Sequence, residues 1–476
     1  MEQMNQTQVI QQKLMTVFPS YGSPLKKQLA IDETEKIFRT LAGSLAQQKS
    51  SWSTISGLCS VKNDFTTEPP VLVNKKGTVF PLWKIVLDFE MTWLKKRTKT
   101  VSVLDYGAVG DGEKDCTTAF KKALDSGFRR VIIPPGNYVI REIEVPSHTE
   151  LVGSGINRTR LVLHKDAPKK ARLITNKHHL NGNHHIYIEG MSLDWNVTRL
   201  SSTEKTATGG TYSSGITLAK VKYAVIRNVK IINPGLHGID VTSTLYNYSG
   251  DGLRATGGSQ YVWIDQIETS GFGDDGITTH HSDYLFISNS YAHHPSGRSH
   301  KKGYSNSNGI EVDDGSQHVT LVNNHTAFCF GGVEIKAHET SSAASDVQIV
   351  GHFSEHDNRS YNFRHIGHHQ GDDAYSKSAF GIRATFLAAC YPQTTNLYTA
   401  STPRSLVVSA YQKVAIHQFF AVTKQENRSD KIAIAIQYRA AEVAIKGIQL
   451  RNYGHAKKPV RIGKETGRVY LDGYVV

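Results

Sequence analysis

The 476-residue chain has few cysteines and no long apolar run. Its four cysteines, Cys59, Cys116, Cys329 and Cys390, are widely spaced with no CxxC pair, which excludes a disulfide framework and a zinc ribbon. No stretch of 18 apolar residues occurs, which excludes a membrane-spanning helix. The polar N-terminus, MEQMNQTQVIQQKL, lacks the layout of a signal peptide, so any action outside a cell is expected to depend on another route of release.

Acidic residues are outnumbered by basic ones. The chain has 55 Lys and Arg against 42 Asp and Glu, a formal charge of +13 and a pI near 9.3. Such a charge suits nucleic acid or an acidic polymer such as a polyuronate, an anionic capsule or teichoic acid, and a solvated surface without a charged partner is the alternative. The basic residues form no long run and no stripe with interleaved aromatics, so we expect no nucleic-acid partner.

Residues 1–98 lack a repeat and predict a small, partly helical N-terminal domain. A helix is predicted from Ile31 to Leu45, capped by Asp32, because aliphatic residues recur there at a spacing of four. The apolar segment 80–94 is too short and too charged to cross a bilayer. We expect it to form a helix that packs against a partner surface.

Residues 99–170 change to short β-branched runs separated by turns. A helix is predicted from about Asp115 to Ser126. The predicted strands that follow it are Val131–Ile133, Tyr138–Ile140, Ile143–Val145 and Leu151–Val152.

The same stretch carries a long ordered motif. Its elements are Asp105-Tyr106-Gly107-Ala108, Gly110-Asp111-Gly112, Thr117, Ala119, Pro134-Pro135-Gly136-Asn137-Tyr138 and Gly153-Ser154-Gly155. The motif resembles the opening of pectate-lyase-superfamily right-handed parallel β-helices, which occur in phage tailspikes and polysaccharide-degrading enzymes, although Cys116 stands where that family usually has Asp. The resemblance implies a β-helix over residues 99–476, with residues 1–98 as an attachment domain.

Internal repeats independently predict an all-β solenoid. A glycine followed by an aliphatic residue recurs at positions 215, 238, 276, 309 and 332, with spacings of 23, 38, 33 and 23. A period of 23 is one coil, and the longer spacings are coils with insertions. Short apolar runs typical of strands continue to the C-terminus, so the solenoid is expected to extend that far. A cap, a trimer contact or a partner protein should then cover its open end.

Aligning the repeats gathers polar side chains on one face, because the residue after each inward aliphatic points outward. One outward column is Thr217, Asp240, Thr278, Glu311 and Glu334, and the next is Ala219, Thr242, His280, Asp313 and Lys336, with His237, Asp274 and Asp275 just before the glycines. Like charges on neighbouring coils repel one another, so such a column lowers stability. A protein that keeps the column is therefore expected to need it for function. A polar ladder without catalysis is the alternative.

The two long insertions, residues 244–258 and 292–306, flank this face and are predicted to form a groove for an extended charged glycan. We predict that the polar residues of the face and of the second insertion bind substrate. These residues are Asp240, His237, His280, Asp313, Lys336, Arg298 and Lys302.

The same coils resemble a degenerate polygalacturonase pattern, in which NTD, GDD, GHG and RIK stand on successive coils. Gly273-Asp274-Asp275 matches GDD, and Glu334-Ile335-Lys336 resembles RIK with Glu in place of Arg. Asn308 replaces the His of GHG, and His237 replaces the Asp of NTD. The pattern implies glycosidic cleavage by two carboxylates, and we predict Asp274, Asp275, Glu311 and Glu334 as the catalytic residues.

Together these features predict a homotrimeric phage tailspike or tail appendage in the virion, with residues 1–98 bound to other tail proteins. It would depolymerise a bacterial surface polysaccharide or teichoic acid outside the cell, with no cofactor, metal, nucleic acid or membrane. Three alternatives stay open: β-elimination on a uronate with Lys336 or a histidine as base, phosphodiester cleavage by metal-bound Asp and His, and receptor binding without catalysis.

Overall fold

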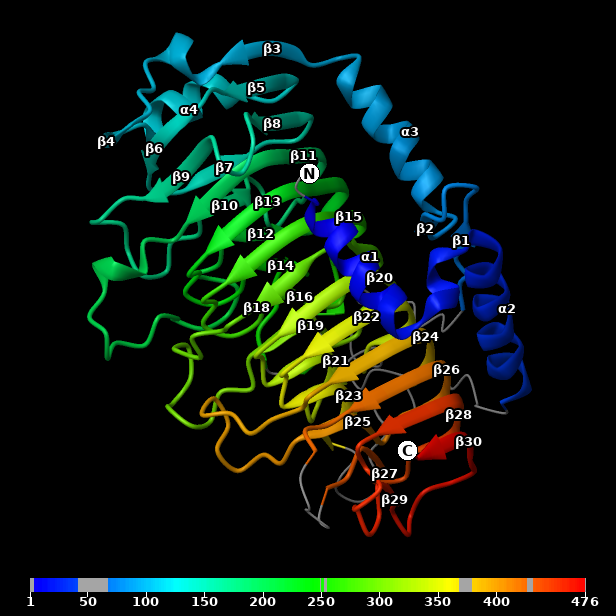
Figure 1. The fold of residues 1–476 in the computed structure, drawn as a ribbon. Helices are drawn as coiled ribbons and strands as arrows, with labels where there is room; N and C mark the ends of the chain where they lie inside the picture. The colour runs from blue at the N-terminus through cyan, green and yellow to red at the C-terminus, as the bar shows by residue number, and fades with distance from the viewer. Residues whose placement is uncertain are drawn as a thin grey trace, which may run out of the picture.

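The computed structural model is a single solenoid of stacked coils (Figure 1). It describes residues 4–41, 67–248, 250–251, 255–367, 379–425 and 431–475. Strands of successive coils pair in parallel, each with its equivalent in the next coil. The predicted right-handed parallel β-helix is confirmed.

One face of the solenoid is an 11-stranded sheet of short strands. These strands are β7 (Ile143–Val145), β10 (Ile174–Asn176), β12 (Ile216–Ala219), β14 (Ile239–Thr242), β16 (Ile277–Thr279), β19 (Asn308–Val312), β21 (Gly331–Ala337), β23 (Arg359–His365), β25 (Arg404–Ser409), β27 (Ile434–Gln437) and β29 (Val460–Ile462). The aliphatic residue after each repeated glycine is buried in the core, as predicted. These residues are Ile216, Ile239, Ile277, Ile310 and Val333.

A second set of strands, most of them longer, forms the remaining faces. They are β8 (Thr149–Gly153), β9 (Thr159–Leu163), β11 (Asn183–Asp194), β13 (Val221–Ile232), β15 (Gln260–Ser270), β17 (Asp283–Ser288), β18 (Tyr291–His293), β20 (Gln317–Ala327), β22 (Ser345–Glu355), β24 (Phe380–Cys390), β26 (Gln412–Val422), β28 (Ala441–Arg451) and β30 (Val469–Val475). A residue with positive φ, such as Gly190, Asn228 or Asn323, interrupts many of them near the middle. This left-handed residue bends the strand, so that one strand serves two faces.

The first coil closes the N-terminal end of the core. It contains β3 (Lys99–Ser102) and β4 (Asp111–Asp115), which pair with β5 (Arg129–Ile133) and β6 (Gly136–Ile140) of the second coil. The helix α4 (Thr117–Leu124) lies within the predicted range and buries Phe120 and Leu124 in the same core. An apolar helix at this position covers the edge that an open solenoid would expose.

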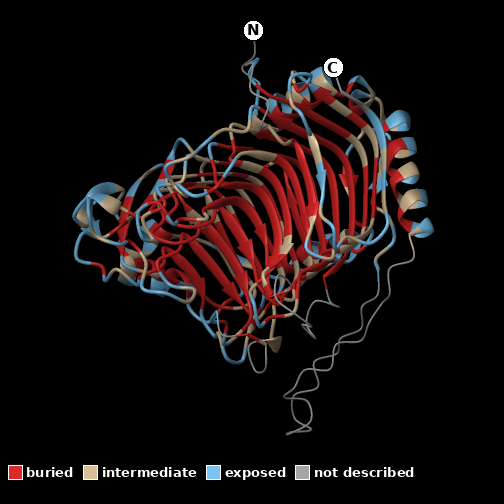
Figure 2. Cartoon of the chain, turned by 90° about the horizontal axis from the view of Figure 1, so that it is seen from below, coloured by how far each residue is buried: buried red, intermediate tan, exposed pale blue. Residues whose placement is uncertain are grey.

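Three N-terminal helices lie along the outside of the long strands (Figure 1). α1 (Gln6–Val17) contacts β20 and β22, α2 (Pro24–Thr40) contacts β24 and β26, and α3 (Lys84–Lys95) contacts β11, β13 and β15. The short hairpin of β1 (Leu72–Val73) and β2 (Val79–Phe80) connects α2 to α3. Figure 2 shows that the helix faces toward the strands are buried and the outer faces are exposed. The surface that the predicted apolar helix packs against is therefore the chain's own solenoid.

The predicted helix start at Asp32 is wrong. α2 begins at Pro24, and the Ser23 hydroxyl accepts a hydrogen bond from the backbone N–H of Lys26 at 3.4 Å. Proline at the first helical position after a serine cap is a stronger start signal than an internal aspartate. Asp32 lies inside the helix, where it accepts a hydrogen bond from Gln28. The helix ends at Thr40, and Leu45 lies outside the described residues.

We expect Leu14→Ala to loosen the N-terminal helices. Leu14 is fully buried between α1 and the solenoid, and a cavity of this size costs about 2–5 kcal/mol. Limited proteolysis should therefore cut within residues 4–41 faster than in the parent protein. Val9→Ala on the exposed side of the same helix is the matched control and should leave the rate unchanged. Equal cleavage rates for the two variants would contradict this assignment.

Cys116, Cys329 and Cys390 are buried free thiols, and Cys59 lies outside the described residues.

Among the residues that the structure describes, no helix combines the length and apolar character needed to span a membrane.

Candidate active site

The first predicted column is confirmed as a register of neighbouring strands on the 11-stranded sheet. Thr217 pairs with Asp240, Asp240 with Thr278, Thr278 with Glu311, and Glu311 with Glu334. The side chains are buried, because loops and neighbouring polar groups cover this part of the sheet. Burial makes each uncompensated charge expensive, so the partners of these carboxylates decide what the face can do.

Asp274 and Asp275 form the acidic pair at the end of the turn before β16. His300 Nε2 lies 2.7 Å from Asp274 Oδ1, and His237 Nε2 lies 3.6–3.7 Å from both carboxylates. Burial opposes ionisation of Asp274, but the contacts to His237 and His300 outweigh it and lower its pKa. Burial and the charge of Asp274 raise the pKa of Asp275 well above its ordinary value. The surroundings therefore shift the pKa values of the two carboxyl groups in opposite directions, which favours a general acid beside an ionised carboxylate.

Asn308 connects this pair to Glu311. Its backbone N–H and its amide donate to Asp275 Oδ1 at 2.9 and 3.0 Å, and the same amide donates to Glu311 Oε1 at 2.9 Å. One buried amide thus fixes the relative positions of two predicted catalytic carboxyl groups.

Lys336 compensates the negative charge of two carboxylates on the neighbouring coil that contains β19. Its ammonium lies 2.7 Å from Glu311 Oε1 and 3.5 Å from Asp313 Oδ2. Burial of Glu311 would raise its pKa, but Lys336 prevails and lowers it. Burial and the neighbouring Asp314 raise the pKa of Asp313 to about 7. Glu334 does not pair with Lys336, because the Arg364 guanidinium donates to it instead.

Asp240 lies beneath the acidic pair and between two histidines. Its carboxylate is 3.2 Å from His280 Nδ1 and 3.5 Å from His237 Nδ1. The ring of Tyr246 stacks on His280 with centroids 3.8 Å apart. Although burial disfavours the imidazolium, the carboxylates of Asp240 and Asp274 raise the pKa of His237 well above its ordinary value. His237 therefore links Asp240 to the acidic pair, and these carboxylates favour its protonated form.

A pocket of about 370 Å³ opens above this network. Its lining includes Asp274, Asp275, Glu311 and Lys336 from the predicted set, together with Tyr248, His300 and His338. Tyr248 and His300 come from the two predicted insertions, so both insertions contribute to the walls. The pocket therefore brings together two carboxyl groups with oppositely shifted pKa values and the Lys336 ammonium.

The other predicted residues lie outside the pocket lining. His237, Asp240, His280, Asp313 and Glu334 are buried beneath or beside the pocket, where they hold the lining residues in place. The Arg298 guanidinium donates to the backbone carbonyls of Ser201 and Glu204, so it anchors a neighbouring loop. Lys302 is exposed on its loop and is not a lining residue of the pocket.

Several residues of the site were not predicted. His338 lies two residues beyond Lys336, just after the end of β21, and His300 is one of the histidines of an insertion that already carried predicted residues. Lys205, which also lines the pocket, comes from a loop outside the repeat pattern. Counting two residues on from Lys336 could have found His338, but no repeat signal identifies Lys205.

Three residue groups here bring potential metal ligands within 4.8 Å of one another: His237, Asp274 and Asp275; His280, Glu311 and Asp313; and Asp313, Asp314 and His338. In the second group, the Lys336 ammonium already contacts both carboxylates. The first group places two of its members, Asp274 and Asp275, in the lining of the pocket, whereas the second and third groups each place one there, Glu311 and His338.

Comparison with known proteins places this geometry in context. The family described as rhamnogalacturonase A/epimerase, pectate lyase-like, matches residues 100–334. The Bacillus subtilis (strain 168) protein YobO, described as phage-related, is 45% identical over 386 residues, which is 81% of this chain and 48% of YobO. The pre-neck appendage protein of Bacillus phage phi29 is 38% identical over 366 residues, 76% of this chain and 42% of that protein.

Among solved structures, the N-terminal fragment of bacteriophage phi29 gene product 12 is similar, with a TM-score of 0.73 and 35% identity. The match covers 83% of this chain and 66% of the fragment. The chain spans about half the length of the curated relatives that it matches. The chain is therefore a right-handed parallel β-helix protein that is similar to the pectate-lyase-like family over residues 100–334 and to phage pre-neck appendage proteins over most of its length.

Proposed function

We propose that this chain is part of a phage tail appendage that binds and depolymerises a bacterial surface glycan by glycosidic hydrolysis. The observation that carries the proposal is a pocket lined by Asp274, Asp275, Glu311 and Lys336, in which the pKa values of the two aspartates shift in opposite directions. The names of the pre-neck appendage relatives support the appendage role and a place in the virion. The net charge of +13 suits an anionic capsule, exopolysaccharide or teichoic acid.

In this mechanism Asp275 donates its proton to the leaving glycosidic oxygen. Asp274 or Glu311, held ionised by neighbouring cations, activates water or attacks the sugar. Lys336 keeps Glu311 charged throughout. Glu334, which pairs with Arg364 away from the pocket, supports the strand below these groups.

The proposal is tested by incubating the full chain with purified capsule, exopolysaccharide and wall teichoic acid. We expect one polymer to shorten on size-exclusion chromatography with an increase in reducing ends. Products that absorb in the ultraviolet band of unsaturated uronates would show a lyase instead. Retention of a polymer without any shortening would contradict catalysis and identify a binding module.

Phosphodiester cleavage of a teichoic acid is the second candidate. The ligand atoms of His237, Asp274 and Asp275 are close enough to hold a divalent cation at the pocket. In the same experiment this reaction would release phosphate monoesters and stop after chelation, whereas hydrolysis by the two carboxyl groups would continue.

We also propose that the protein is a homotrimer attached to tail proteins through residues 1–98. The outer face of α3 exposes Ile85 and Phe89, at 56% and 70%, beside Leu82 and Val86, and an apolar face of this kind is suited to a contact between copies. Light scattering should give three times the chain mass of 52.7 kDa. A stable monomer at micromolar concentration would contradict the trimer.

A further inference from the structure

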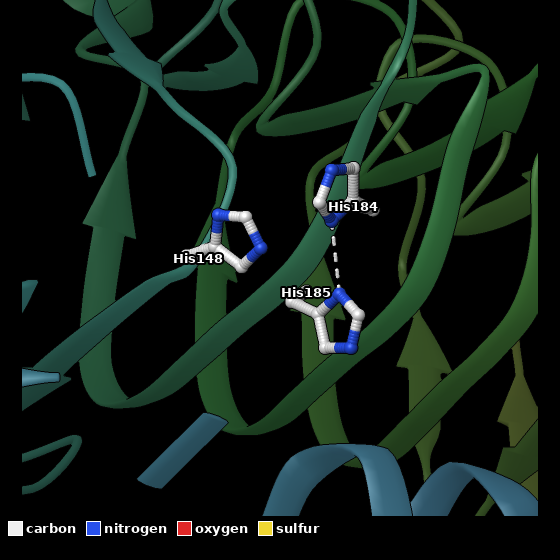
Figure 3. A group of neighbouring side chains, drawn as sticks. All are labelled: His148, His184 and His185. Atoms are coloured by element: carbon white, nitrogen blue, oxygen red, sulfur yellow. Dashed lines mark hydrogen bonds between the residues drawn. The ribbon is translucent and has the colours of Figure 1, made fainter. Parts of the chain in front are cut away.

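Three histidines lie together near the N-terminal end of the solenoid, and none of them lines the candidate active site. His148 lies in the turn before β8, and His184 and His185 lie at the start of β11. Figure 3 shows the three rings turned toward one another. One ring nitrogen of each histidine lies within 4.8 Å of a ring nitrogen of the other two.

The contacts of His185 identify which nitrogen it presents to this centre. Its Nε2 lies 2.9 Å from the Glu90 carboxylate of α3, and its Nδ1 lies 2.9 Å from His184 Nδ1. We assign the proton to Nε2, because a carboxylate can only accept a hydrogen bond. The Nδ1 lone pair then faces the other two rings. A carboxylate that orients the far nitrogen of a histidine is the usual outer partner of a metal-binding imidazole.

Aromatic packing holds the rings in this orientation. His148 stacks on Phe128 with centroids 4.0 Å apart, and Trp93 of α3 packs against both His148 and His185. His185 is buried, His148 is half-buried and His184 is exposed, so the centre is open to solvent on the His184 side. Ligands held in place before binding reduce the entropy lost when a metal binds, and the open side leaves a coordination position for water.

We propose that His148, His184 and His185 form a binding site for a divalent first-row transition metal ion, of which Zn²⁺ is the best match. Imidazole nitrogen suits Zn²⁺, Ni²⁺ and Cu²⁺, whereas Ca²⁺ and Mg²⁺ prefer oxygen ligands. Water completes a four-coordinate site. Glu90 is a positioning residue that acts through His185 and connects α3 to the site. The bound metal therefore reinforces the attachment of α3 to the first coils.

The test uses the full chain after removal of metal with a chelator and dialysis. Titration with CoCl₂ should give one equivalent with the intense visible absorption of four-coordinate Co²⁺, and ZnCl₂ should displace it. This spectrum needs no variant. Absence of the visible band in the parent protein would overturn the proposal.

Variants then assign the band to these residues. His184→Asn should abolish it, and the exposed position of His184 makes the substitution compatible with folding, which circular dichroism would verify. Glu90→Gln should weaken Zn²⁺ binding about 10–100-fold, as expected when the outer partner of a ligand is lost. The matched control is His455→Asn, an exposed histidine in the C-terminal coils, which should bind like the parent. Unchanged Zn²⁺ affinity in both His184→Asn and His148→Asn would overturn the proposal.

Discussion

Asp275→Asn is expected to abolish polymer cleavage while leaving the fold and polymer binding intact. Removal of a general acid typically lowers the rate by about 10²–10⁴-fold. Burial and the charge of Asp274 raise the pKa of Asp275, so the neutral asparagine resembles the protonated form that this environment favours. Its carbonyl oxygen can accept the same two hydrogen bonds from Asn308. The measurement is the initial rate of cleavage together with retention of the polymer.

The companion variant Asp274→Asn distinguishes chemistry from structure. It removes the ionised partner of His237 and His300, so we expect loss of activity together with some loss of stability. Asp166→Asn, an exposed aspartate outside the pocket, is the matched control and should cleave like the parent protein. If Asp274→Asn and Asp275→Asn both keep full activity, the site lies elsewhere, and the loop with His293, Arg298 and Lys302 is the next place to look.

Lys336→Met should give the largest loss of stability. The Lys336 side chain is 4% exposed, and its ammonium contacts the buried carboxylates of Glu311 and Asp313. Removing one partner of a buried ion pair costs about 3–5 kcal/mol, because the remaining charge keeps its desolvation penalty. The urea midpoint, followed by circular dichroism, should therefore fall sharply.

The pH dependence of this variant separates lost charge from lost packing. Without Lys336, burial raises the pKa of the remaining carboxyl groups, so their protonation at lower pH removes the uncompensated charge. The stability difference from the parent should therefore shrink as the pH falls toward and below these raised pKa values. Lys165→Met, at an exposed lysine, is the control and should keep the parent midpoint. A stability loss independent of pH would contradict the electrostatic explanation.

The sequence predicted the solenoid because its signals are local and repeated. The glycine–aliphatic pairs fix which residues of each short strand point inward, and stacking repeats the choice in the next coil. The two columns that contain Asp240, Glu311 and Lys336 follow from that alternation alone. The predicted start of α2 is wrong because the aliphatic spacing does not extend back to Ser23-Pro24, where the serine cap and the proline begin the helix.

The sequence by itself therefore determined the fold, the order of the polar residues along the face and the membership of the acidic pair. Only the tertiary structure decided which of these residues reach the pocket and which are paired beneath it. Glu311 and Glu334 stand at equivalent positions, yet Lys336 holds one at the pocket and Arg364 holds the other away from it. Partners such as Arg364, His300 and Glu90 come from other coils, loops or a helix on another face. Charge pairing and burial depend on how close these partners lie in space. The loop paths that bring them together are not encoded in the repeat period.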